Sequence, residues 1–542
     1  MKAPPPCGPE GDAPRIAGRG DGKGRGNDDQ ESSMDTRTLR RKVNEVKAKA
    51  EEHRGPAGHS QEDAPLLDAL RRFHAEDTLS LAIPAHKSGA GAPDDVLELL
   101  GEAAFRADQT MLNGVDNRHE SWQVQTAAQE LAAEALGADQ CLFSTNGSTA
   151  SVHSAISAVV GPGEKLAVSR NAHKSVITGL IHAGAVPVWL EAEYDEDLDV
   201  AHGVTPDTVR RALAEHPDCK AVMIVSPSYY GVCSRVPDIA EIAHGHGIPL
   251  VSDDAWALAY KFHPELPEFA LDAGADLAIG SVHKTLSGLS QTSIISVKGD
   301  RIDTVRLSLA LETYETTSGS SLLLASIDAA RRQMVQDGER LLGEALRLAR
   351  RLRAGAQALG YPTIEPDDIL RRASAWAFNE LHVTLDVRHL GLTGYKAADW
   401  LRGHEAVAVE LADHRRVMAC VTHADSDDSI DRALSAFEAL AHGGPRFTRA
   451  SPSVPSPTEL RTKQVMTPQR AFYADVEMVP IDRAGGRIAA EFVTPYPPGI
   501  PLVVPGERIN EAIVDYLKTG AADGIYAEGC ADQSLSELRV VA

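Results

Sequence analysis

A lysine that directly follows a short apolar run is the residue in this chain with the clearest chemical potential. In segment 274–293, Ser281, His283 and Lys284 come after the apolar run 277–280 and before a series of small residues. An amine that is partly removed from water near a cationic centre has a lowered pKa and attacks carbonyl groups. Lys284 is therefore a candidate Schiff-base lysine, and the alternative interpretation is an ordinary solvated lysine in a loop.

A second apolar run, residues 248–252, ends in Asp253. Ligands of open α/β sheets collect at the carboxyl ends of the strands, so a carboxylate there could keep a pyridine nitrogen protonated. That charge makes pyridoxal phosphate an electron sink. The alternative is a helix cap, which suits the neighbouring Asp254 better than Asp253.

Segment 142–156 runs from an apolar strand pattern through Asn146, Gly147, Ser148 and Thr149 into a helical pattern. Backbone N–H groups and two hydroxyls at a helix N-terminus form a cup for phosphate. The P-loop pattern and the GxGxxG fingerprint are both missing, which counts against a nucleotide. The same junction also occurs as a plain capping structure, so it is weak when taken alone.

Segment 166–180 opens with another apolar run and then carries Arg170, Asn171, His173 and Lys174. His173 could lie flat on a cofactor ring, although a lone histidine is more often an ordinary polar residue. The four segments each supply one part of a cofactor site: a ring stack, a phosphate cup, a nitrogen partner and a Schiff-base lysine. Their conjunction predicts a site for pyridoxal phosphate.

These segments belong to an alternation of strands and helices between about residue 65 and residue 330. The β-branched runs that we expect to be strands are 221–225, 249–252, 277–280 and 293–297. Their alternation with amphipathic segments predicts a mostly parallel α/β sheet. One helix is expected to begin near Ser121, to pack on the sheet through residues such as Leu131, and to end at Gly137.

The chain divides further along its length. A long helix is expected at 322–358, and the Gly- and Pro-rich stretch 443–457 has the composition of a linker. The expected parts are a disordered or helical N-terminal extension (1–65), a large cofactor-binding domain (66–330), a small α/β domain (331–442), a linker (443–460) and a C-terminal α+β domain (461–542).

Composition limits the function. The 542 residues are 43% hydrophobic and 24% charged, as in large globular chains. With 54 Lys and Arg against 77 Asp and Glu, the net charge is −23, which disfavours nucleic acid as the main ligand and suits a cationic small substrate. No apolar stretch approaches the roughly 20 residues of a membrane span, and the N-terminus lacks the apolar core of a secretory signal, so we expect a cytoplasmic protein.

The six cysteines give no sign of a metal site. They are scattered without a CxxC pair, which favours a reduced compartment and no structural zinc. Two pairs deserve consideration as ligands, His244 with His246 and Asp253 with Asp254, but neighbouring residues in a strand point to opposite faces. We expect no bound metal.

Several motifs resemble the Orn/Lys/Arg decarboxylase family, the fold-type I pyridoxal-phosphate enzymes that act on basic amino acids. The resemblance extends over roughly residues 75 to 540. The segments that carry it are IPAHKSG (83–89), FSTNGSTAS (143–151), SRNAHKS (169–175), SPSYYGVCSRV (226–236), DDAWA (253–257), SVHKTLSGLSQTS (281–293), GRIAAEFVTPYPPGIPLVVPGE (486–507) and a closing LRVV. The block that contains YPPGIP and PGE is specific, because generic aminotransferases do not carry it.

The resemblance implies a role for each motif residue. Lys284 would carry the cofactor as a Schiff base, His173 would stack on its ring, and Asp253 would pair with the pyridine nitrogen. The remaining residues implied to bind the cofactor or its surroundings are Gly147, Ser148, Thr149, Ala255, Ser281, His283, Thr317 and Ser318.

The family resemblance also implies a homodimer, or a multiple of dimers, with the active site at the subunit interface. Segment 316–321 matches one that reaches the partner's cofactor, but the family's usual SPSY reads SGSS at 318–321. The usual PGHK reads PAHK at 84–87, and the large N-terminal wing of the acid-stress members is absent. Which hydroxyl makes the contact is left open, and a decamer built through that wing is not expected.

The reaction implied is loss of CO2 from arginine, lysine or ornithine to give the amine. His283 or the released Lys284 is the hypothetical donor of the Cα proton. For the substrate's distal cation we expect Glu507 near the site entrance, and the alternative is a charge at the start of the following helix. The three substrates differ by one or two methylenes and a head group, and arginine or lysine is favoured over ornithine.

Two other enzyme functions stay open at this point. One is another reaction on the same fold, as in an aminotransferase, an aldolase or an oxidative deaminase. The other is a serine acyl-transferase, because Ser281 and Lys284 fit SxxK, with STN at 144–146 and KTG at 518–520 as companions. The order of these motifs is the reverse of that family's, and the KTG lies in a helical pattern rather than a strand.

Overall fold

The computed structural model describes residues 58–75, 79–110, 115–116, 123–444, 459–495, 499–523 and 527–542. Residues 1–57, Ser121 and most of the expected linker lie outside this set. All of the elements below belong to one compact unit, His59–Ala542.

The centre of the fold is a seven-stranded sheet with the order β1-β10-β9-β8-β6-β2-β3. Its strands are β1 (Gln140–Ser144), β2 (Lys165–Ser169), β3 (Val186–Leu190), β6 (Cys219–Val225), β8 (Leu250–Asp253), β9 (Leu277–Ser281) and β10 (Ser293–Val297). Only β10 runs antiparallel to its neighbours, β1 and β9. The predicted mostly parallel sheet is confirmed. Three predicted runs lie within β6, β9 and β10, and the run 249–252 begins one residue before β8.

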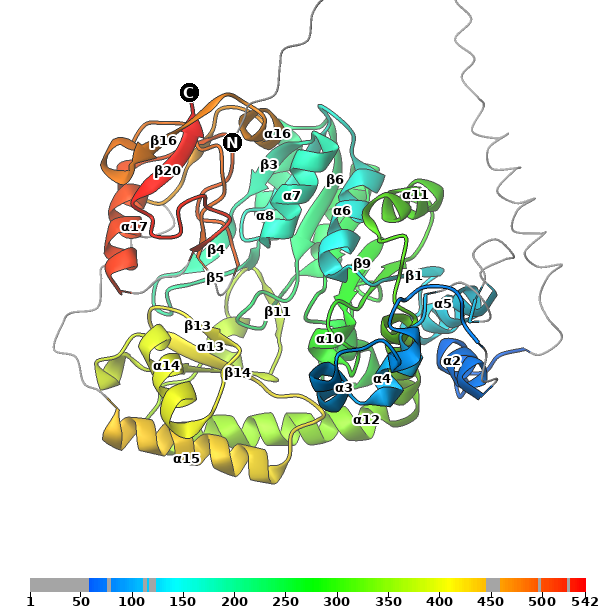
Figure 1. Cartoon of the computed structure of the whole chain (residues 1–542). Helices are drawn as coiled ribbons and strands as arrows, with labels where there is room; N and C mark the ends of the chain where they lie inside the picture. The colour runs from blue at the N-terminus through cyan, green and yellow to red at the C-terminus, as the bar shows by residue number, and fades with distance from the viewer. Residues whose placement is uncertain are drawn as a thin grey trace, which may run out of the picture. The chain divides into compact units, whose positions relative to one another are not determined.

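Helices cover both faces of the sheet, as Figure 1 shows for α6, α7 and α11 on one face. These helices are α6 (Gly147–Val159), α7 (Lys174–Ala183) and α11 (Thr304–Tyr314). The other face packs against α2 (Pro65–Ala75), α5 (Gln123–Leu136), α8 (Pro206–Glu215), α9 (Val236–Gly245) and α12 (Ser321–Ala358). A parallel sheet needs this double cover, because its strands are apolar on both sides.

The long predicted helix is α12, which has 38 residues and runs through the expected boundary at residue 330. Two glycines inside it allow close packing against the turn η2 (Leu258–Phe262) and the residue after it. A Cβ on Gly338 would lie 2.9 Å from the Cβ of Phe262, and one on Gly343 would lie 3.1 Å from Nε2 of His263. The helix therefore binds closely to the large-sheet half of the fold.

The C-terminal half of α12 packs against a three-stranded antiparallel sheet and a helix. The sheet has the order β12 (His382–Asp386), β14 (Arg416–Cys420) and β13 (Leu411–Ala412), and it is covered by α14 (Gly394–Glu405) and α15 (Asp427–Gly443). Near it lie α13 (Pro366–Leu370), the strand pair β7 (Val232–Ser234) with β11 (Ala375–Phe378), and the strand pair β4 (Ala192–Asp195) with β5 (Val200–Val204).

Residues 459–542 form three two-stranded sheets and two helices around a separate apolar core. The elements are β15 (Lys463–Gln464) with β18 (Glu507–Arg508), β16 (Val476–Pro480) with β20 (Glu537–Val541), β17 (Thr494–Pro495) with β19 (Ala527–Glu528), α16 (Pro468–Phe472) and α17 (Glu511–Asp523). Helix α16 packs on α7, where Gln469 donates a 2.8 Å hydrogen bond to the carbonyl of Ile181. This part therefore lies beside the helix that follows His173.

None of the helices in the described part of the chain is long and apolar enough to span a membrane.

Candidate active site

Lys284 lies in the single turn α10 (Val282–Thr285) that follows β9. Its Nζ is 4.6 Å from the centroid of the Trp256 ring. Burial lowers the pKa of Lys284, while the nearby carboxylates of Asp253 and Glu410 and the thiol of Cys420 oppose that shift. The amine is thus half-buried, close to an aromatic face, and easier to deprotonate than a surface lysine.

Asp253 is the last residue of β8 and is only 5% exposed. Its carboxylate accepts a 3.2 Å hydrogen bond from the backbone N–H of Ala255. Burial raises its pKa, and the positive charge of Lys284 works in the opposite direction. The neighbouring Asp254 has a different role, because it accepts hydrogen bonds from the hydroxyl of Ser252 and the N–H of Ala270.

The predicted phosphate cup is the N-terminus of α6. The side chain of Asn146 does not cap this helix, so it leaves the first N–H groups to another acceptor. Gly147 has a φ of +72° and donates its own N–H to the carbonyl of Gln291 at 2.8 Å. The Ser148 hydroxyl is 2.6 Å from that of Ser281, which ties the cup to the strand end before Lys284. Thr149 lies on the next position and is exposed.

His173 and His283 flank the cup. His173 precedes α7, and its Nδ1 accepts a 3.2 Å hydrogen bond from the N–H of Ser175. Burial and the neighbouring Lys284, Lys174 and His153 lower its pKa to about 3. His283 holds its Nδ1 3.0 Å from the carbonyl of Thr292, and burial lowers its pKa.

Residues that the sequence did not single out complete the site. Trp256 follows β8, is 7% exposed, and packs edge-on against His382 with ring centroids 5.2 Å apart. Burial lowers the pKa of His382 to about 4, and Lys284 contributes to that shift. The DDAWA motif contains Trp256, so a signal existed there, whereas nothing in the sequence near His382 indicates chemistry.

Glu410 and Cys420 reach the site from the small sheet. Both line a cavity of about 580 Å³ beside α15, together with the carboxylates of Asp425 and Asp428. Burial raises the pKa of Glu410, and Lys284 lowers it. Lys284 and Glu410 each shift the other's pKa, so the amine of the large sheet and the carboxylate of the small sheet interact electrostatically.

The surroundings of Glu507 do not match the predicted role of a cation receptor at the site entrance. It lies in β18, is 1% exposed, and accepts hydrogen bonds from the guanidinium of Arg170 (3.1 Å) and the N–H of Val504 (2.9 Å). Arg170 also donates to the carbonyls of Pro501 and Leu502. The carboxylate is therefore occupied in holding the C-terminal part against the end of β2, and it precedes α17 by too many residues to cap it.

Thr317 and Ser318 are exposed in the loop between α11 and α12, next to Glu315. Glu315 accepts hydrogen bonds from the hydroxyl of Ser144 (2.6 Å) and the N–H of Thr145 (2.9 Å), immediately before the phosphate cup. The loop is thus anchored near the cup of its own chain, while the two hydroxyls face outward.

The residues present suit pyridoxal phosphate. They provide an uncapped helix N-terminus with hydroxyls for the phosphate and a buried carboxylate for the ring nitrogen. An amine with a lowered pKa lies near that carboxylate. The buried Nε1 of Trp256 has no partner within the described residues, which leaves a polar atom at this site for a ligand to satisfy.

The alternatives receive no support from the geometry. KTG (518–520) lies inside α17, and Ser281 is fully buried against Ser148. Among the residues that the structure describes, no group of three or more His, Cys, Asp or Glu is placed to hold a metal ion. His244 lies in α9 rather than in a strand, so the predicted geometry of the His244 and His246 pair was wrong.

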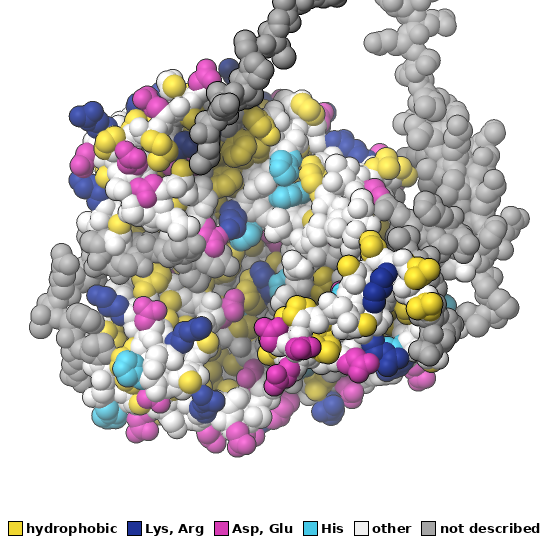
Figure 2. Space-filling view, viewed as in Figure 1, with side chains coloured by type: hydrophobic (Ala, Val, Ile, Leu, Met, Phe, Trp, Pro, Cys, Tyr) yellow, Lys and Arg dark blue, Asp and Glu magenta, His cyan; other side chains and the backbone are white. Residues whose placement is uncertain are grey.

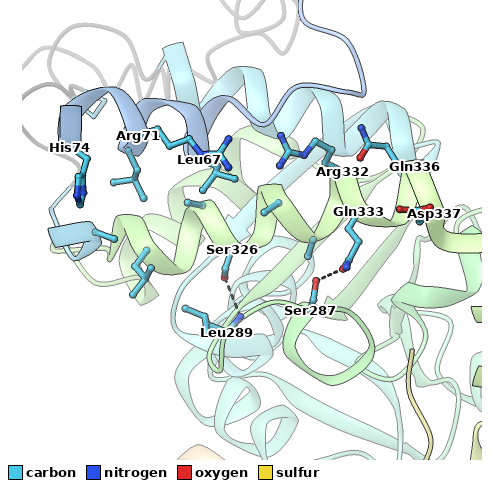
Figure 3. A pocket seen from close by; sticks show the side chains of 16 residues that line it. Leu67, Arg71, His74, Ser287, Leu289, Ser326, Arg332, Gln333, Gln336 and Asp337 are labelled. Carbon is cyan, nitrogen blue, oxygen red and sulfur yellow. Dashed lines mark hydrogen bonds between the residues drawn. The ribbon is translucent and has the colours of Figure 1, made fainter. Parts of the chain in front are cut away.

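A separate open groove of about 790 Å³ lies between α2, α12 and the loop that follows Lys284. Figure 3 shows the two bonds that tie this loop to α12. Ser287 donates to the side chain of Gln333 at 2.6 Å, and the N–H of Leu289 donates to the Ser326 hydroxyl at 3.1 Å. These two bonds hold the loop after Lys284 on α12, and none of the predicted catalytic residues lines the groove.

Comparison with structures of known proteins shows the same fold. Lysine decarboxylase A from Pseudomonas aeruginosa superposes with a TM-score of 0.75 at 20% identity, covering 93% of this chain and 82% of that one. The constitutive lysine decarboxylase of Escherichia coli gives a TM-score of 0.72 at 19% identity, covering 94% and 85%. The predicted fold class is confirmed.

Sequence comparison gives the family. The model for the Orn/Lys/Arg decarboxylase major domain matches residues 64–382, and the model for the C-terminal domain of that family matches residues 456–523. The arginine decarboxylase of Bacillus subtilis is 35% identical over 486 residues, which cover 89% of this chain and 98% of that protein. The arginine decarboxylase of Halalkalibacterium halodurans is also 35% identical, over 485 residues with the same coverage. The lysine decarboxylase LdcA of Pseudomonas aeruginosa is 24% identical over 568 residues, covering 84% and 75%. With these matches and the site described above, the chain belongs to the Orn/Lys/Arg decarboxylase family.

Proposed function

We propose that the chain removes the α-carboxylate of a basic amino acid as CO2 with bound pyridoxal phosphate, and that arginine is its substrate. One observation carries the proposal: Lys284, Asp253, His173 and the open N-terminus of α6 lie at one edge of one sheet. Relatives that are 35% identical over nearly their whole length are named arginine decarboxylases, which supports the choice of substrate.

Each residue has a definite task in this proposal. Lys284 would hold the cofactor through its amine, whose pKa burial lowers. Asp253 is buried and would pair with the ring nitrogen, because a cation there favours its charged form. When bound, pyridoxal phosphate supplies an electron sink for the carbanion that remains as CO2 leaves. His173 would stack on the ring and hold it in place.

The phosphate is held by the α6 terminus together with nearby hydroxyls. Ser148 and Ser281 are joined by a hydrogen bond, so Ser281 would hold Ser148 in place while the hydroxyl of Ser148 or Thr149 binds a phosphate oxygen. The proposed set around the cofactor is completed by Gly147, Thr149, Ala255 and His283, with His283 or the freed Lys284 returning a proton to Cα.

Glu410 is our candidate for the distal cation of the substrate, in place of Glu507. The cavity that Glu410 lines has apolar walls, including Val407 and Val409, and acidic groups. Methylenes followed by a guanidinium or ammonium match that combination, because a charge needs a partner when it leaves water.

We also propose a cytoplasmic homodimer, or a multiple of dimers, built from the large, small and C-terminal domains predicted above. The segment before α3 (Asp94–Leu100) exposes 85% of Leu79, 88% of Leu81 and 58% of Ile83, and α3 itself exposes 81% of Leu99. Figure 2 shows apolar side chains among carboxylates in this region, over α3 and α4 (Glu102–Ala107). Exposed apolar surface of this kind is usually covered by another protein surface.

An end-point assay tests the function. Purified protein with pyridoxal phosphate and equal amounts of arginine, lysine and ornithine is analysed for amines and CO2 by mass spectrometry, beside a Lys284→Ala sample. We expect agmatine and CO2 from the wild type and none from Lys284→Ala, while Lys298→Ala, a half-buried lysine outside the site that pairs with Asp272, behaves as wild type. Loss of substrate without CO2 would favour an aminotransferase or oxidative deaminase, and no turnover would refute the proposal.

A further inference from the structure

The two histidines of the site are held through the same ring nitrogen but by opposite kinds of group. The Nδ1 of His173 lies 3.2 Å from the backbone N–H of Ser175 and 2.9 Å from the Ser175 hydroxyl. A backbone N–H can only donate, so Nδ1 of His173 must present a lone pair. The proton of the neutral ring is then on Nε2.

The Nδ1 of His283 lies 3.0 Å from the carbonyl oxygen of Thr292. A carbonyl can only accept, so this Nδ1 must carry the proton. The lone pair of His283 is then on Nε2. The main chain thus places a donor, the N–H of Ser175, against His173 and an acceptor, the carbonyl of Thr292, against His283. Neither of these backbone groups can change from donor to acceptor or the reverse.

We infer that the fold locks these histidines in opposite tautomers, His173 as Nε2–H and His283 as Nδ1–H, and that Ser175 is the positioning residue for His173. The mechanistic meaning of this inference rests on the proposed function, whereas the tautomers themselves do not. Ser175 is 4% exposed in the first turn of α7, with both of its donors directed at one ring nitrogen.

The surroundings of His173 favour a neutral ring. The charged or titratable groups that act on it are Lys284 from α10, Lys174 from α7 and His153 from α6. All three oppose a positive charge, and burial acts in the same direction, so the pKa is lowered to about 3. The charge of Lys284 also lowers the pKa of His283.

The two tautomers divide the work of the site. His173 presents only an N–H, so it can donate a hydrogen bond to a carboxylate or a ring substituent but cannot take up a proton while Ser175 occupies Nδ1. His283 presents a lone pair at Nε2 and can take up and return a proton. Of the two histidines, only His283 can therefore exchange protons with the substrate.

Nitrogen NMR of the full-length protein, labelled at histidine and loaded with pyridoxal phosphate, tests the inference. His173→Gln and His283→Gln samples assign the two rings. Between about pH 5 and pH 9, where an ordinary histidine titrates, we expect His173 to keep an unprotonated Nδ1 and His283 a protonated Nδ1. A wild-type His173 that is protonated at Nδ1 at neutral pH would overturn the inference.

Three variants probe Ser175 itself. Ser175→Pro removes the N–H and the hydroxyl together, and the second position of a helix accepts proline, as Pro237 in α9 shows. We expect His173 to become a mixture of tautomers and to titrate, whereas Ser175→Ala, which keeps the N–H, shifts the Nδ1 signal by less. Ser175→Thr, which keeps the hydroxyl, should restore the wild-type signal.

Thr178→Ala in the same helix is the matched control, since the Thr178 hydroxyl donates to the carbonyl of Lys174 and, among the described residues, makes no hydrogen bond to His173. If Ser175→Pro does not fold, Ser175→Ala decides: an Nδ1 signal that is unchanged, as in Thr178→Ala, would overturn the role of Ser175. The decarboxylase assay is independent of the NMR signals. Locked tautomers without CO2 release would refute the proposed function and leave this inference intact.

Discussion

The site has two halves that differ in how the chain builds them. The half at the large sheet consists of Lys284, Asp253, His173 and the α6 terminus, each at a strand end or a helix start. The half at the small sheet consists of His382 in β12, Cys420 in β14 and Glu410 before β13, all of which come later in the chain than Lys284. We propose that the first half carries the groups for bond making. The cavity that Glu410 and Cys420 of the second half line also has Asp425, Asp428 and Arg432 on its walls.

The difference indicates that reactivity and substrate choice are separable in this fold. The groups at the large-sheet edge are set by turns that place backbone donors and carboxylates at fixed positions, a general requirement of the cofactor. The small-sheet groups act on Lys284 electrostatically. Substitutions in the first half should reduce kcat, and those in the second should mainly raise KM.

Asp253→Asn is the substitution in the first half from which we expect the largest effect. We expect kcat to fall by roughly 10²- to 10³-fold, the usual cost of removing one preorganised electrostatic group. Cofactor absorbance and steady-state rates measure the effect, and KM should change little. If KM rose while kcat stayed constant, the division between the halves would be wrong.

Glu507→Gln tests whether Glu507, the first candidate for binding the distal cation of the substrate, takes part in either half of the site. The buried carboxylate of Glu507 pairs with the guanidinium of Arg170. Removing its charge should lower the free energy of unfolding by about 2–3 kcal/mol, because the guanidinium loses its counter-charge. Urea unfolding measures this loss. Unchanged KM for arginine is expected in the folded variant, and a raised KM with full stability would return Glu507 to substrate binding.

Glu410→Gln tests the second half directly. Loss of one charged hydrogen bond to the substrate cation, worth about 1.5–3 kcal/mol, should raise KM for arginine by about tenfold or more. Glu438→Gln, an exposed residue of α15, is the control and should leave KM unchanged. Equal KM values for Glu410→Gln and the wild type would contradict the assignment.

The smallest expected effect is on the pH dependence of the unfolding free energy, and it comes from Asp254, the buried carboxyl next to Asp253. Burial raises the pKa of Asp254 to about 7 in the folded chain, from 3.8. The folded state then binds the proton more tightly than the unfolded state, so this group stabilises the fold at low pH and the contribution disappears as pH rises through about 7.

The slope from this one group is at most about 1.4 kcal/mol per pH unit. Unfolding free energies of Asp254→Asn and wild type, compared between about pH 4 and pH 7, measure it. A constant difference across that range would show that Asp254 does not titrate there.

The sequence was informative wherever chemistry coincided with a strand end. Lys284, Asp253 and Ser148 follow apolar runs, and such runs predict both the strand and the place where it stops. His382 and Glu410 could not be found this way, because their role depends on how the small sheet faces the large one. Nothing local in the chain encodes that orientation.

The contact that Glu507 makes could not be predicted from the sequence for a related reason. Its motif, PGE, indicated the right neighbourhood, since the residue lies against Arg170 beyond the end of β2. Whether a carboxylate faces solvent or a guanidinium depends on a contact between positions 337 residues apart. Spacing along the chain carries no information about that pairing.

Helix α12 connects the two halves mechanically. Its 38 residues correspond to about 57 Å at 1.5 Å per residue, with one end beside the loop 316–320 and the other under the small sheet. Close packing around Gly338 fixes its middle to the large-sheet half. A rod fixed at its centre moves its two ends in opposite senses. Any tilt of the small sheet that admits or closes over a substrate would thus be felt at the exposed Thr317 and Ser318, and a partner pressed against that loop could set the width of the cavity at Glu410.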